Sequence, residues 1–208
     1  MHEPDVLEGY AADAAELVPR YEAICYAELF APVADLLPTS AGRVLDVGAG
    51  TGRSAAWFAD QGHRVVAAEP VGAFIDAAKG LHPSPRISWV QDRLPELRQV
   101  QAMEEPFDLI TLVGVWQHLA LGQREAAIPT LAALAAPGAR LILSLRHGPG
   151  APNRPCFPCD PGETIAAAQA AGLRLVRRVV APSVQQQNRD AGVTWTWLAF
   201  DKGQASIH

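Results

Sequence analysis

The chain of 208 residues has few cysteines, no long apolar run and no run of basic residues. Its three cysteines follow no disulfide-like spacing, which is typical of a protein from a reducing compartment. No uninterrupted apolar stretch reaches the roughly 18 residues that a membrane span requires. The N-terminal residues also lack the positive region and apolar core of a secretory signal peptide. These absences predict a cytoplasmic protein without a membrane partner.

Charge and composition limit which partners and which class of protein we expect. The formal net charge is -5 and the pI is about 5.6, so the phosphate backbone of a nucleic acid is not an expected partner. With 49% hydrophobic and 19% charged residues, the composition is that of a globular protein. The length fits one α/β domain. We therefore expect a single domain over 1–208, with a helical cap over 1–40 and an α/β core over 41–208.

Three alternate glycines dominate the stretch 43–53, which reads RVLDVGAGTGR. The apolar residues before them are typical of a buried parallel strand, and those after them of a helix. Gly48, Gly50 and Gly52 therefore stand at a strand-to-helix turn, where glycine permits positive φ and a close approach of a ligand. Helix amide groups at such a turn favour an anionic group.

Two residues decide which ligand this turn suits. Arg53 stands where the GxGxxG pattern of dinucleotide-binding loops needs a glycine, so the spacing here is GxGxG. Asp46 precedes the first glycine by two residues, and a carboxylate there would repel a pyrophosphate but suits a ligand that carries a cation. The run 46–52, DVGAGTG, resembles the first motif of the class I S-adenosylmethionine-dependent methyltransferases, whose cofactor carries an ammonium and a sulfonium. The resemblance implies S-adenosylmethionine as cofactor, bound by Asp46, Gly48, Ala49, Gly50 and Gly52.

Strands and helices alternate from residue 41 onward, which predicts a parallel sheet with helices on both faces. The loop 181–192 leaves no room for a helical crossover, so the last strand should run antiparallel to the one before it. The resemblance, which covers residues 41 to about 200, implies a doubly wound, seven-stranded Rossmann-like sheet of order 3-2-1-4-5-7-6. The expected strands are 43–48, 64–68, 87–90, 107–113, 139–145, 173–180 and 193–200, and the expected helices are 53–61, 71–80, 122–136 and 161–171, with a variable helix or loop over 95–104.

Helical spacing of apolar residues also extends over 5–37, where Pro19, Pro32 and Pro38 should divide two or three short helices. In the resembled family such N-terminal helices cover the cofactor pocket and part of the substrate entrance. Tyr10 and Arg20 could therefore contact the cofactor's carboxylate or the substrate. Core packing of Tyr10 and solvation of Arg20 are the alternatives.

Acidic residues follow the second and third strands. Glu69, before Pro70, ends the second strand, and a carboxylate there can accept hydrogen bonds from both ribose hydroxyls of an adenosine. A nicotinamide-binding fold would use the same position. After the third strand, the resemblance implies that Asp92 accepts from the adenine amine and that the Arg93 backbone N–H meets the ring. The alternative for Asp92 is a solvated loop residue.

The fourth strand ends near Val113, where the resemblance places the cofactor's methyl group against the substrate. His118 lies just beyond and is the candidate general base, because a near-neutral imidazole can remove a proton from a hydroxyl or an amine. The alternatives are that it anchors the next helix, or binds substrate without proton transfer. Trp116 and Gln117 are candidates for the substrate wall, although Trp116 could equally belong to the core.

The fifth strand ends near Arg146 and His147, which are candidates to hold an anionic group of the substrate. Arg146 could instead pair with a structural carboxylate. From 149 to 161, prolines recur at every third residue, which is the period of polyproline II and predicts a stiff strap that serves as substrate wall or lid. The CxxC pair at 156–159 has no second pair at zinc spacing, so no metal site is expected. The run 160–163 (DPGE) resembles a capping box.

The lead hypothesis is an enzyme that transfers a methyl group from S-adenosylmethionine to a small-molecule acceptor by in-line displacement. One alternative is a nicotinamide-dependent oxidoreductase, which the GxGxG spacing and Asp46 disfavour. The other is a non-catalytic module that binds S-adenosylmethionine and works through a partner. The antiparallel edge of the sheet could mediate a homodimer.

Overall fold

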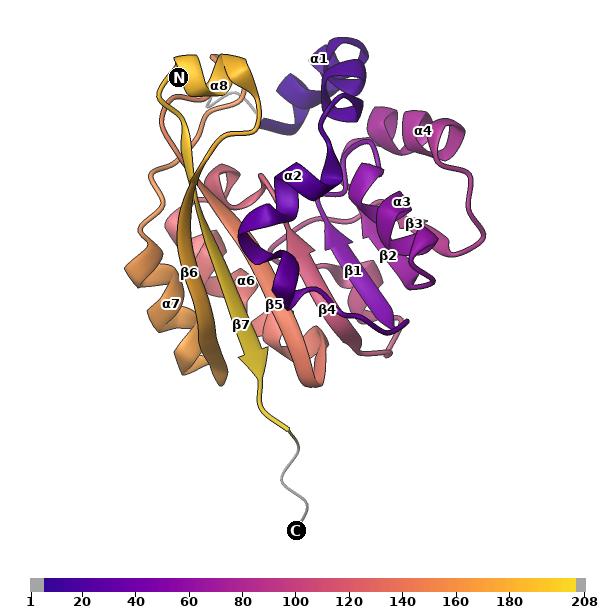
Figure 1. Cartoon of the computed structure of the whole chain (residues 1–208), viewed down its shortest axis with the longest axis vertical. Coiled ribbons are helices and arrows are strands. Elements are labelled where there is room, and N and C mark those ends of the chain that lie inside the picture. Colours follow the sequence, from indigo (N-terminus) through magenta and orange to yellow (C-terminus); the bar gives the residue numbers. More distant parts are fainter. Residues whose placement is uncertain (1–5, 205–208) are drawn as a thin grey trace.

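A computed structural model describes residues 6–204 and contains one seven-stranded sheet (Figure 1). Its order is β3-β2-β1-β4-β5-β7-β6, and β7 runs antiparallel to both of its neighbours, which confirms the predicted topology. The longest strand, β5, begins four residues before its predicted start, because Ala135 already pairs with Phe107 across an irregularity in the ladder. The strands are β1 (Arg43–Val47), β2 (Arg64–Ala68), β3 (Ile87–Val90), β4 (Phe107–Leu112), β5 (Ala135–His147), β6 (Leu173–Pro182) and β7 (Thr194–Lys202).

The helices follow the predicted order with two additions, the short η2 after β4 and α8 within the predicted loop 181–192. Pro19 lies inside α1 and does not divide it. The structure does not describe residues 1–5 and 205–208 of the predicted domain. Residue 5, the first of the predicted helical region 5–37, is among them. The helices are α1 (Val6–Glu22), α2 (Tyr26–Phe30), η1 (Ala31–Leu36), α3 (Arg53–Asp60), α4 (Gly72–Leu81), α5 (Arg98–Gln101), η2 (Trp116–His118), α6 (Leu121–Leu134), α7 (Pro161–Ala170) and α8 (Gln186–Asp190).

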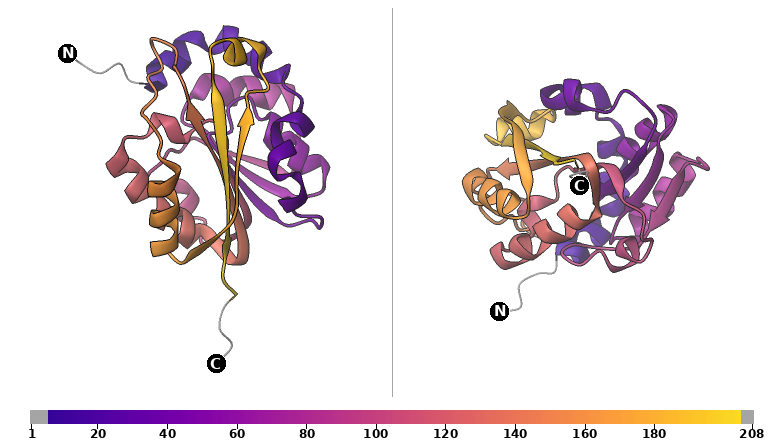
Figure 2. Two further views of the ribbon diagram at one scale, coloured as in Figure 1. Left: turned by 60° about the vertical axis from the view of Figure 1, so that its left-hand side comes forward. Right: turned by 90° about the horizontal axis from the view of Figure 1, so that it is seen from below.

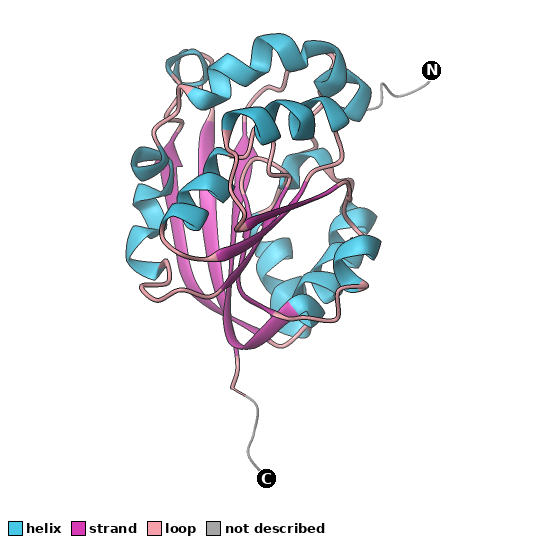
Figure 3. Cartoon of the chain, turned by 90° about the vertical axis from the view of Figure 1, so that its right-hand side faces the viewer, coloured by secondary structure: helices cyan, strands magenta, loops and turns pink. Residues whose placement is uncertain are grey.

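Both faces of the sheet are covered by helices, which explains why its central strands are apolar on both sides (Figure 3). Leu45 and Val47 of β1 belong to a core shared with α5, α6 and α7. Val44, which directly precedes Leu45 on β1, belongs to a second core shared with α2, η1 and α3. Successive side chains of one strand thus supply opposite cores, as the pleat requires.

A third, smaller apolar cluster holds α1 above the carboxyl ends of the parallel strands (Figures 1 and 2). Ala14 and Leu17 of α1 pack against Val71 and Phe74 at the start of α4. This roof and the loops beneath it enclose the site described next. Among residues 6–204, no helix is long and apolar enough to cross a membrane.

Candidate functional site

A cavity of about 1180 Å³ lies under α1, at the carboxyl ends of β1 to β5. Single small-molecule sites enclose roughly 300–1,000 Å³, so this cavity has room for more than one ligand. Its walls come from α1, the loops after five strands, the strap and the α8 region. Most predicted site residues line it: Tyr10, Arg20, Asp46, Gly48, Ala49, Gly50, Glu69, Pro70, Asp92, Arg93, Val113, Gln117, His118 and Arg146.

The glycine turn after β1 is bonded to the neighbouring strand. The N–H groups of Gly48 and Ala49 both donate to the carbonyl of Ala68, at 2.7 and 3.2 Å. Gly48 has φ +67°, and a Cβ on it would lie 2.3 Å from Cγ2 of Val115. Gly50 has φ +56°, and a Cβ there would meet no atom within 4 Å. The first glycine therefore permits close packing, and the second opens the backbone to the cavity.

The third glycine of the motif has a different role from the predicted one. Gly52 is not among the described residues that line the cavity; a Cβ on it would lie 2.4 Å from the ring of Trp89. The next residue, Arg53, donates to the carbonyls of Tyr21 (2.6 Å) and Ile24 (3.2 Å). Gly52 thus permits close packing of α3 on β3, and Arg53 ties α3 to the chain at the end of α1.

Glu69 lies at the end of β2 with both carboxylate oxygens facing backbone donors. Oε2 accepts from the N–H of Gly50 at 2.8 Å, and Oε1 accepts from that of Val71 at 2.9 Å. The side chain is 5% exposed, and burial raises the pKa of Glu69 to about 7 despite these two bonds. Each oxygen retains a second lone pair for a further donor in the cavity.

Asp46 is buried at the end of β1 and only half satisfied. Oδ1 accepts from the Thr111 hydroxyl at 2.8 Å, whereas Oδ2 has no hydrogen-bond partner among the described residues. Burial raises the pKa of Asp46 to about 6. An unpaired buried carboxylate oxygen is costly, so this atom fits a ligand that brings a positive charge or a donor.

Asp92 lines the cavity but its carboxylate already organises the loop after β3. Oδ1 accepts from the N–H of Arg93 at 2.9 Å, and Oδ2 accepts from those of Gln99 and Val100 at 2.8 and 3.0 Å. The sequence did not reveal this role, in which Asp92 holds the first turn of α5 against the end of β3. The expected contact with an adenine amine stays a prediction.

His118 and Tyr10 meet at the roof of the cavity. The Tyr10 hydroxyl lies 2.8 Å from Nε2 of His118, and Nδ1 of His118 lies 3.0 Å from the carbonyl oxygen of Pro155. Because a carbonyl only accepts, Nδ1 must carry the proton, and Nε2 therefore accepts from the Tyr10 hydroxyl. Burial lowers the pKa of His118 and raises that of Tyr10 well above its usual range. The His118 imidazole is therefore neutral and accepts a hydrogen bond from the protonated Tyr10 hydroxyl.

The structure corrects two predicted substrate contacts. Trp116 is fully buried in the core, where Nε1 donates to the Thr164 hydroxyl at 3.1 Å. His147 follows Arg146 on β5 and therefore points to the opposite face, where its ring lies 2.8 Å from the Thr196 hydroxyl. Neither is among the described residues that line the cavity, whereas Arg146 is.

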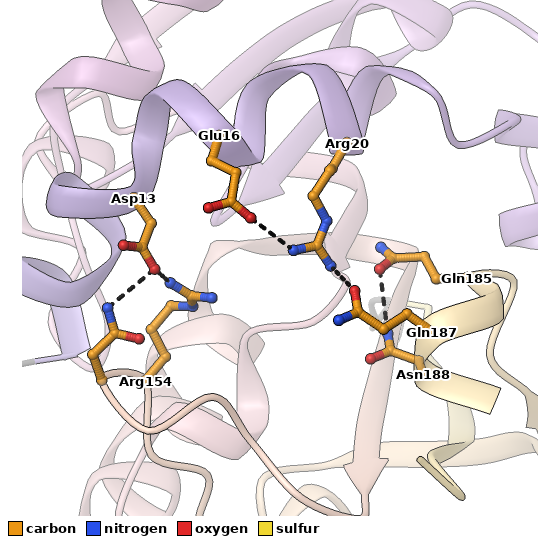
Figure 4. A network of polar contacts seen from close by, with 8 residues as sticks. Asp13, Glu16, Arg20, Arg154, Gln185, Gln187 and Asn188 are labelled. Atoms are coloured by element: carbon orange, nitrogen blue, oxygen red, sulfur yellow. Dashed lines mark hydrogen bonds and ion pairs between the residues drawn. The ribbon is translucent and has the colours of Figure 1, made fainter. Parts of the chain in front are cut away.

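Polar contacts join α1 to the strap and to α8 over the cavity (Figure 4). Asp13 forms an ion pair with Arg154 of the strap and accepts from Asn153 at 3.0 Å. Arg20 donates to Gln187 of α8 at 2.9 Å and lies 3.5 Å from Glu16 within its own helix. Arg20 is therefore bonded to neutral and acidic side chains of the roof, rather than being simply solvated.

The proline-rich strap forms a cavity wall, but not as one continuous polyproline helix. A tight turn with a bridge between Ala151 and Arg154 interrupts it. Farther along, the buried Arg124 donates to the carbonyls of Phe157 and Pro158, which fixes the strap to α6. Asp160 is the N-cap of α7 and accepts from the Gly162 N–H, but the reciprocal bond from Glu163 that a capping box requires is not among the contacts of the described residues.

The strap's cysteines are not activated thiols. Burial raises the pKa of Cys156, and that of Cys159 to about 11. Both are free, and each sulfur faces the carbonyl of the residue two positions before it. Among the described residues, no group of His, Cys, Asp and Glu is arranged to hold a metal ion.

The comparisons with known proteins agree with the fold and the motif. A family model described as a methyltransferase domain matches residues 44–138. Three uncharacterised methyltransferases, from Mycobacterium bovis and two strains of Mycobacterium tuberculosis, are each 30% identical over 108 residues, which are 52% of this chain and 41% of the relative. Over these residues the chain is similar to methyltransferase domains. The matched part spans about two fifths of these curated relatives.

Solved methyltransferases share the architecture at low identity. The Burkholderia thailandensis 1,6-didemethyltoxoflavin-N1-methyltransferase, crystallised with 1,6-didemethyltoxoflavin and S-adenosylhomocysteine, has a TM-score of 0.73 at 21% identity, covering 95% of this chain and 87% of that one. The N-methyltransferase NodS of Bradyrhizobium japonicum with S-adenosylhomocysteine has a TM-score of 0.71 at 18% identity, covering 95% and 98%. Both of these proteins were crystallised with S-adenosylhomocysteine, and in this chain the unpaired oxygen of Asp46 and the open Gly50 belong to residues that line the same cavity.

Several cavity residues were not identified from the sequence. Ser144 of β5 and Trp195 and Trp197 of β7 all line the cavity, and Tyr21 of α1 does so as well. The alternation of the two tryptophans in TWTW was a usable signal, because residues two apart on a strand share a face. Which face meets the cavity depends on the pairing of β5 with β7, which the sequence does not contain.

Proposed function

We propose that this protein is an enzyme that transfers a methyl group from S-adenosylmethionine to a small-molecule acceptor. The observation that carries the proposal is the unpaired, buried Oδ2 of Asp46 in the wall of the cavity. A carboxylate with a raised pKa gains most from a ligand that is cationic or rich in donors. The two solved N-methyltransferases described above support a small acceptor, since one of them was crystallised with such a molecule.

In this proposal the acidic residues of β1 to β3 hold the cofactor. Asp46 would face the cationic methionine end, and Glu69 would accept the ribose hydroxyls through its remaining lone pairs. Pro70, Arg93 and the glycine turn would complete the wall around the adenosyl group. When bound, the cofactor supplies an electrophilic methyl on sulfur, and the residues near Val113 need chiefly to align the acceptor and exclude water.

His118 is proposed as the base, and Tyr10 as the group through which it acts. The acceptor would give its proton to the Tyr10 oxygen as Tyr10 gives its own proton to Nε2 of His118, which leaves an imidazolium bonded to the Pro155 carbonyl. The low pKa of His118 keeps Nε2 free to accept at neutral pH. An acceptor that is already ionised would need neither residue.

Calorimetry separates this proposal from the nicotinamide alternative. S-adenosylmethionine and S-adenosylhomocysteine should bind, and NAD should not bind at the same concentrations. Glu69→Gln should weaken binding of both adenosyl ligands about tenfold, the cost of a charge-assisted hydrogen bond. Asp76→Asn, which changes an exposed carboxylate of α4, is the matched control and should bind like the unchanged protein.

Turnover separates an enzyme from a binding module. Release of S-adenosylhomocysteine would be measured over a panel of phenols, aryl amines and their carboxylated forms. Transfer to any of them supports the proposal, and binding of the cofactor without release over the whole panel favours a non-catalytic module. The cytoplasmic location and the homodimer stay predictions.

A further inference from the structure

Four residues of β5 and β7 form one surface in the wall of the cavity. Arg146 is the register partner of Trp195, and Ser144 is that of Trp197. Directly paired residues of antiparallel strands point to the same face, so these four side chains lie side by side. All four line the cavity. We call this set, Ser144, Arg146, Trp195 and Trp197, the acceptor platform.

The acceptor platform adjoins the loop that follows β4. The Gly114 N–H donates to the Ser144 hydroxyl at 3.0 Å, and a Cβ on Gly114 would lie 3.8 Å from the ring of Trp195. The same loop carries Val113 and continues to His118. A molecule seated on the platform therefore lies next to the place where the proposed function requires the acceptor.

Charged residues line the cavity unevenly. The acidic residues Asp46, Glu69 and Asp92 lie at the ends of β1, β2 and β3, and Glu28, Glu96, Arg53 and Arg93 also line the cavity. From residue 144 to the end of the described chain, the residues that line the cavity include arginines but no aspartate or glutamate. The strands of the platform and the segments next to them in sequence therefore bring positive and no negative charge to the cavity, which favours an anionic ligand there.

Arg146 lacks an acidic partner among residues 6–204. So does Arg189 of α8, which donates to the carbonyls of Ser183 and Val184 and to Oε1 of Gln186, but Arg146 is the one that belongs to the platform. Its Nε and Nη2 donate to the Pro149 carbonyl at 3.3 and 2.7 Å, and Nη2 also donates to Oδ1 of Asn188 at 3.2 Å. These partners are neutral, and Nη1 has no hydrogen-bond partner among residues 6–204. By contrast, Arg154 of the strap is paired with Asp13. The neutral bonds fix the Arg146 guanidinium in place and leave its charge for a ligand.

The platform also offers a flat aromatic surface. The guanidinium carbon of Arg146 lies 5.5 Å from the ring centroid of Trp195, which is a cation–π arrangement. Trp195 is half-buried and Trp197 is buried against Phe30. The β5–β7 pairing places both indoles on one face, and Arg146 and Phe30 pack on them, so they favour a rigid, planar ring over a flexible chain.

We infer that the methyl acceptor is an aromatic acid, whose ring packs on Trp195 and whose carboxylate is bound by Arg146. This inference rests on the proposed function, because it names the substrate class of the same site. A cationic cofactor beside Asp46 and an anionic acceptor beside Arg146 would then occupy different parts of one cavity.

The test uses 1-naphthoate as the probe, titrated by calorimetry into the protein saturated with S-adenosylhomocysteine. Naphthoate should bind at least about tenfold more tightly than the uncharged 1-naphthamide and the non-planar cyclohexanecarboxylate. Arg146→Gln should remove the preference for naphthoate over naphthamide. Arg178→Gln, at an exposed arginine of β6 outside the cavity, is the matched control and should leave the preference unchanged.

The aromatic half of the inference is tested at Trp195. Trp195→Leu should weaken naphthoate binding about tenfold, whereas Trp195→Phe, which keeps a planar ring, should retain most of it. Retained binding of S-adenosylhomocysteine verifies that each variant is folded. Equal affinity for naphthoate and naphthamide overturns the inference, and so does equal affinity for naphthoate and cyclohexanecarboxylate. If S-adenosylhomocysteine itself does not bind the unchanged protein, the proposed function fails first and the inference falls with it.

Discussion

Replacing Asp46 by asparagine should stabilise the ligand-free protein, although Asp46 is central to the proposed site. Burial raises the pKa of Asp46 from 3.8 to about 6, and one unit corresponds to about 1.4 kcal/mol. The folded protein therefore binds this proton more tightly than the unfolded chain does. Above pH 6 the ionised carboxylate lowers the free energy of unfolding by about 3 kcal/mol, and this cost disappears as the pH falls below about 4.

Asparagine is neutral at every pH, and its Oδ1 can still accept from the Thr111 hydroxyl. The free energy of unfolding of Asp46→Asn should exceed that of the unchanged protein by about 2–3 kcal/mol at pH 8, and by about half as much at pH 5. Urea unfolding curves at the two pH values measure both differences. The same variant should lose most of the thermal stabilisation that S-adenosylhomocysteine gives the unchanged protein.

The control is Asp76→Asn, whose exposed carboxylate should give no gain at either pH. A gain of the same size at pH 8 and pH 5 would contradict the reasoning, because it would not follow the titration of Asp46. A loss of stability at pH 8 would refute it outright, since the carboxylate would then stabilise the empty site.

Three further outcomes follow from the same contacts. Because the pKa of Glu69 is about 7 in the free protein, its protonation should lower the affinity for S-adenosylhomocysteine about tenfold from pH 8 to pH 6, and calorimetry in two buffers should detect proton release on binding. Glu69→Gln should reduce this dependence to the roughly twofold fall that protonation of Asp46 leaves. Gly48→Ala should lower the free energy of unfolding by about 1–3 kcal/mol, whereas Gly80→Ala, at an open helical site, should not. NMR titration of His118 should give a pKa below 6.5 with the proton of the neutral ring on Nδ1; a value above 6.5 or the other tautomer would contradict the relay through Tyr10.

The sequence predicts the fold better than it predicts the site. The antiparallel last strand and the acid at the end of β2 follow from local patterns, namely apolar runs and loop lengths, whereas the strand order was predicted from the family resemblance. The face on which a residue lies follows from pairing between distant strands. Arg146 and His147 are therefore equivalent in the sequence, yet only Arg146 lines the cavity. Trp116 and Gln117 are also neighbours in the sequence with different positions in the structure. Both lie in the short turn η2, which directs Trp116 into the core and Gln117 to the cavity.

The contacts of α1 indicate which part of the roof must separate for a ligand to enter. Its apolar contacts, Leu17 and Ala14 against Val71 and Phe74, join it to α4 on the cofactor side. Its contacts with the strap include the partly buried Asp13–Arg154 ion pair, the Arg154 guanidinium over the Tyr10 ring and the close approach of Gly9 to the Asn153 carbonyl. Its contact with α8 is the exposed hydrogen bond from Arg20 to Gln187, which contributes only about 1 kcal/mol because water replaces the partners when they part. Separation is therefore cheaper between α1 and α8 than between α1 and either α4 or the strap. The α8 side adjoins the acceptor platform, since Arg146 donates to Asn188, so we expect the acceptor to exchange there while α1 still covers the bound cofactor.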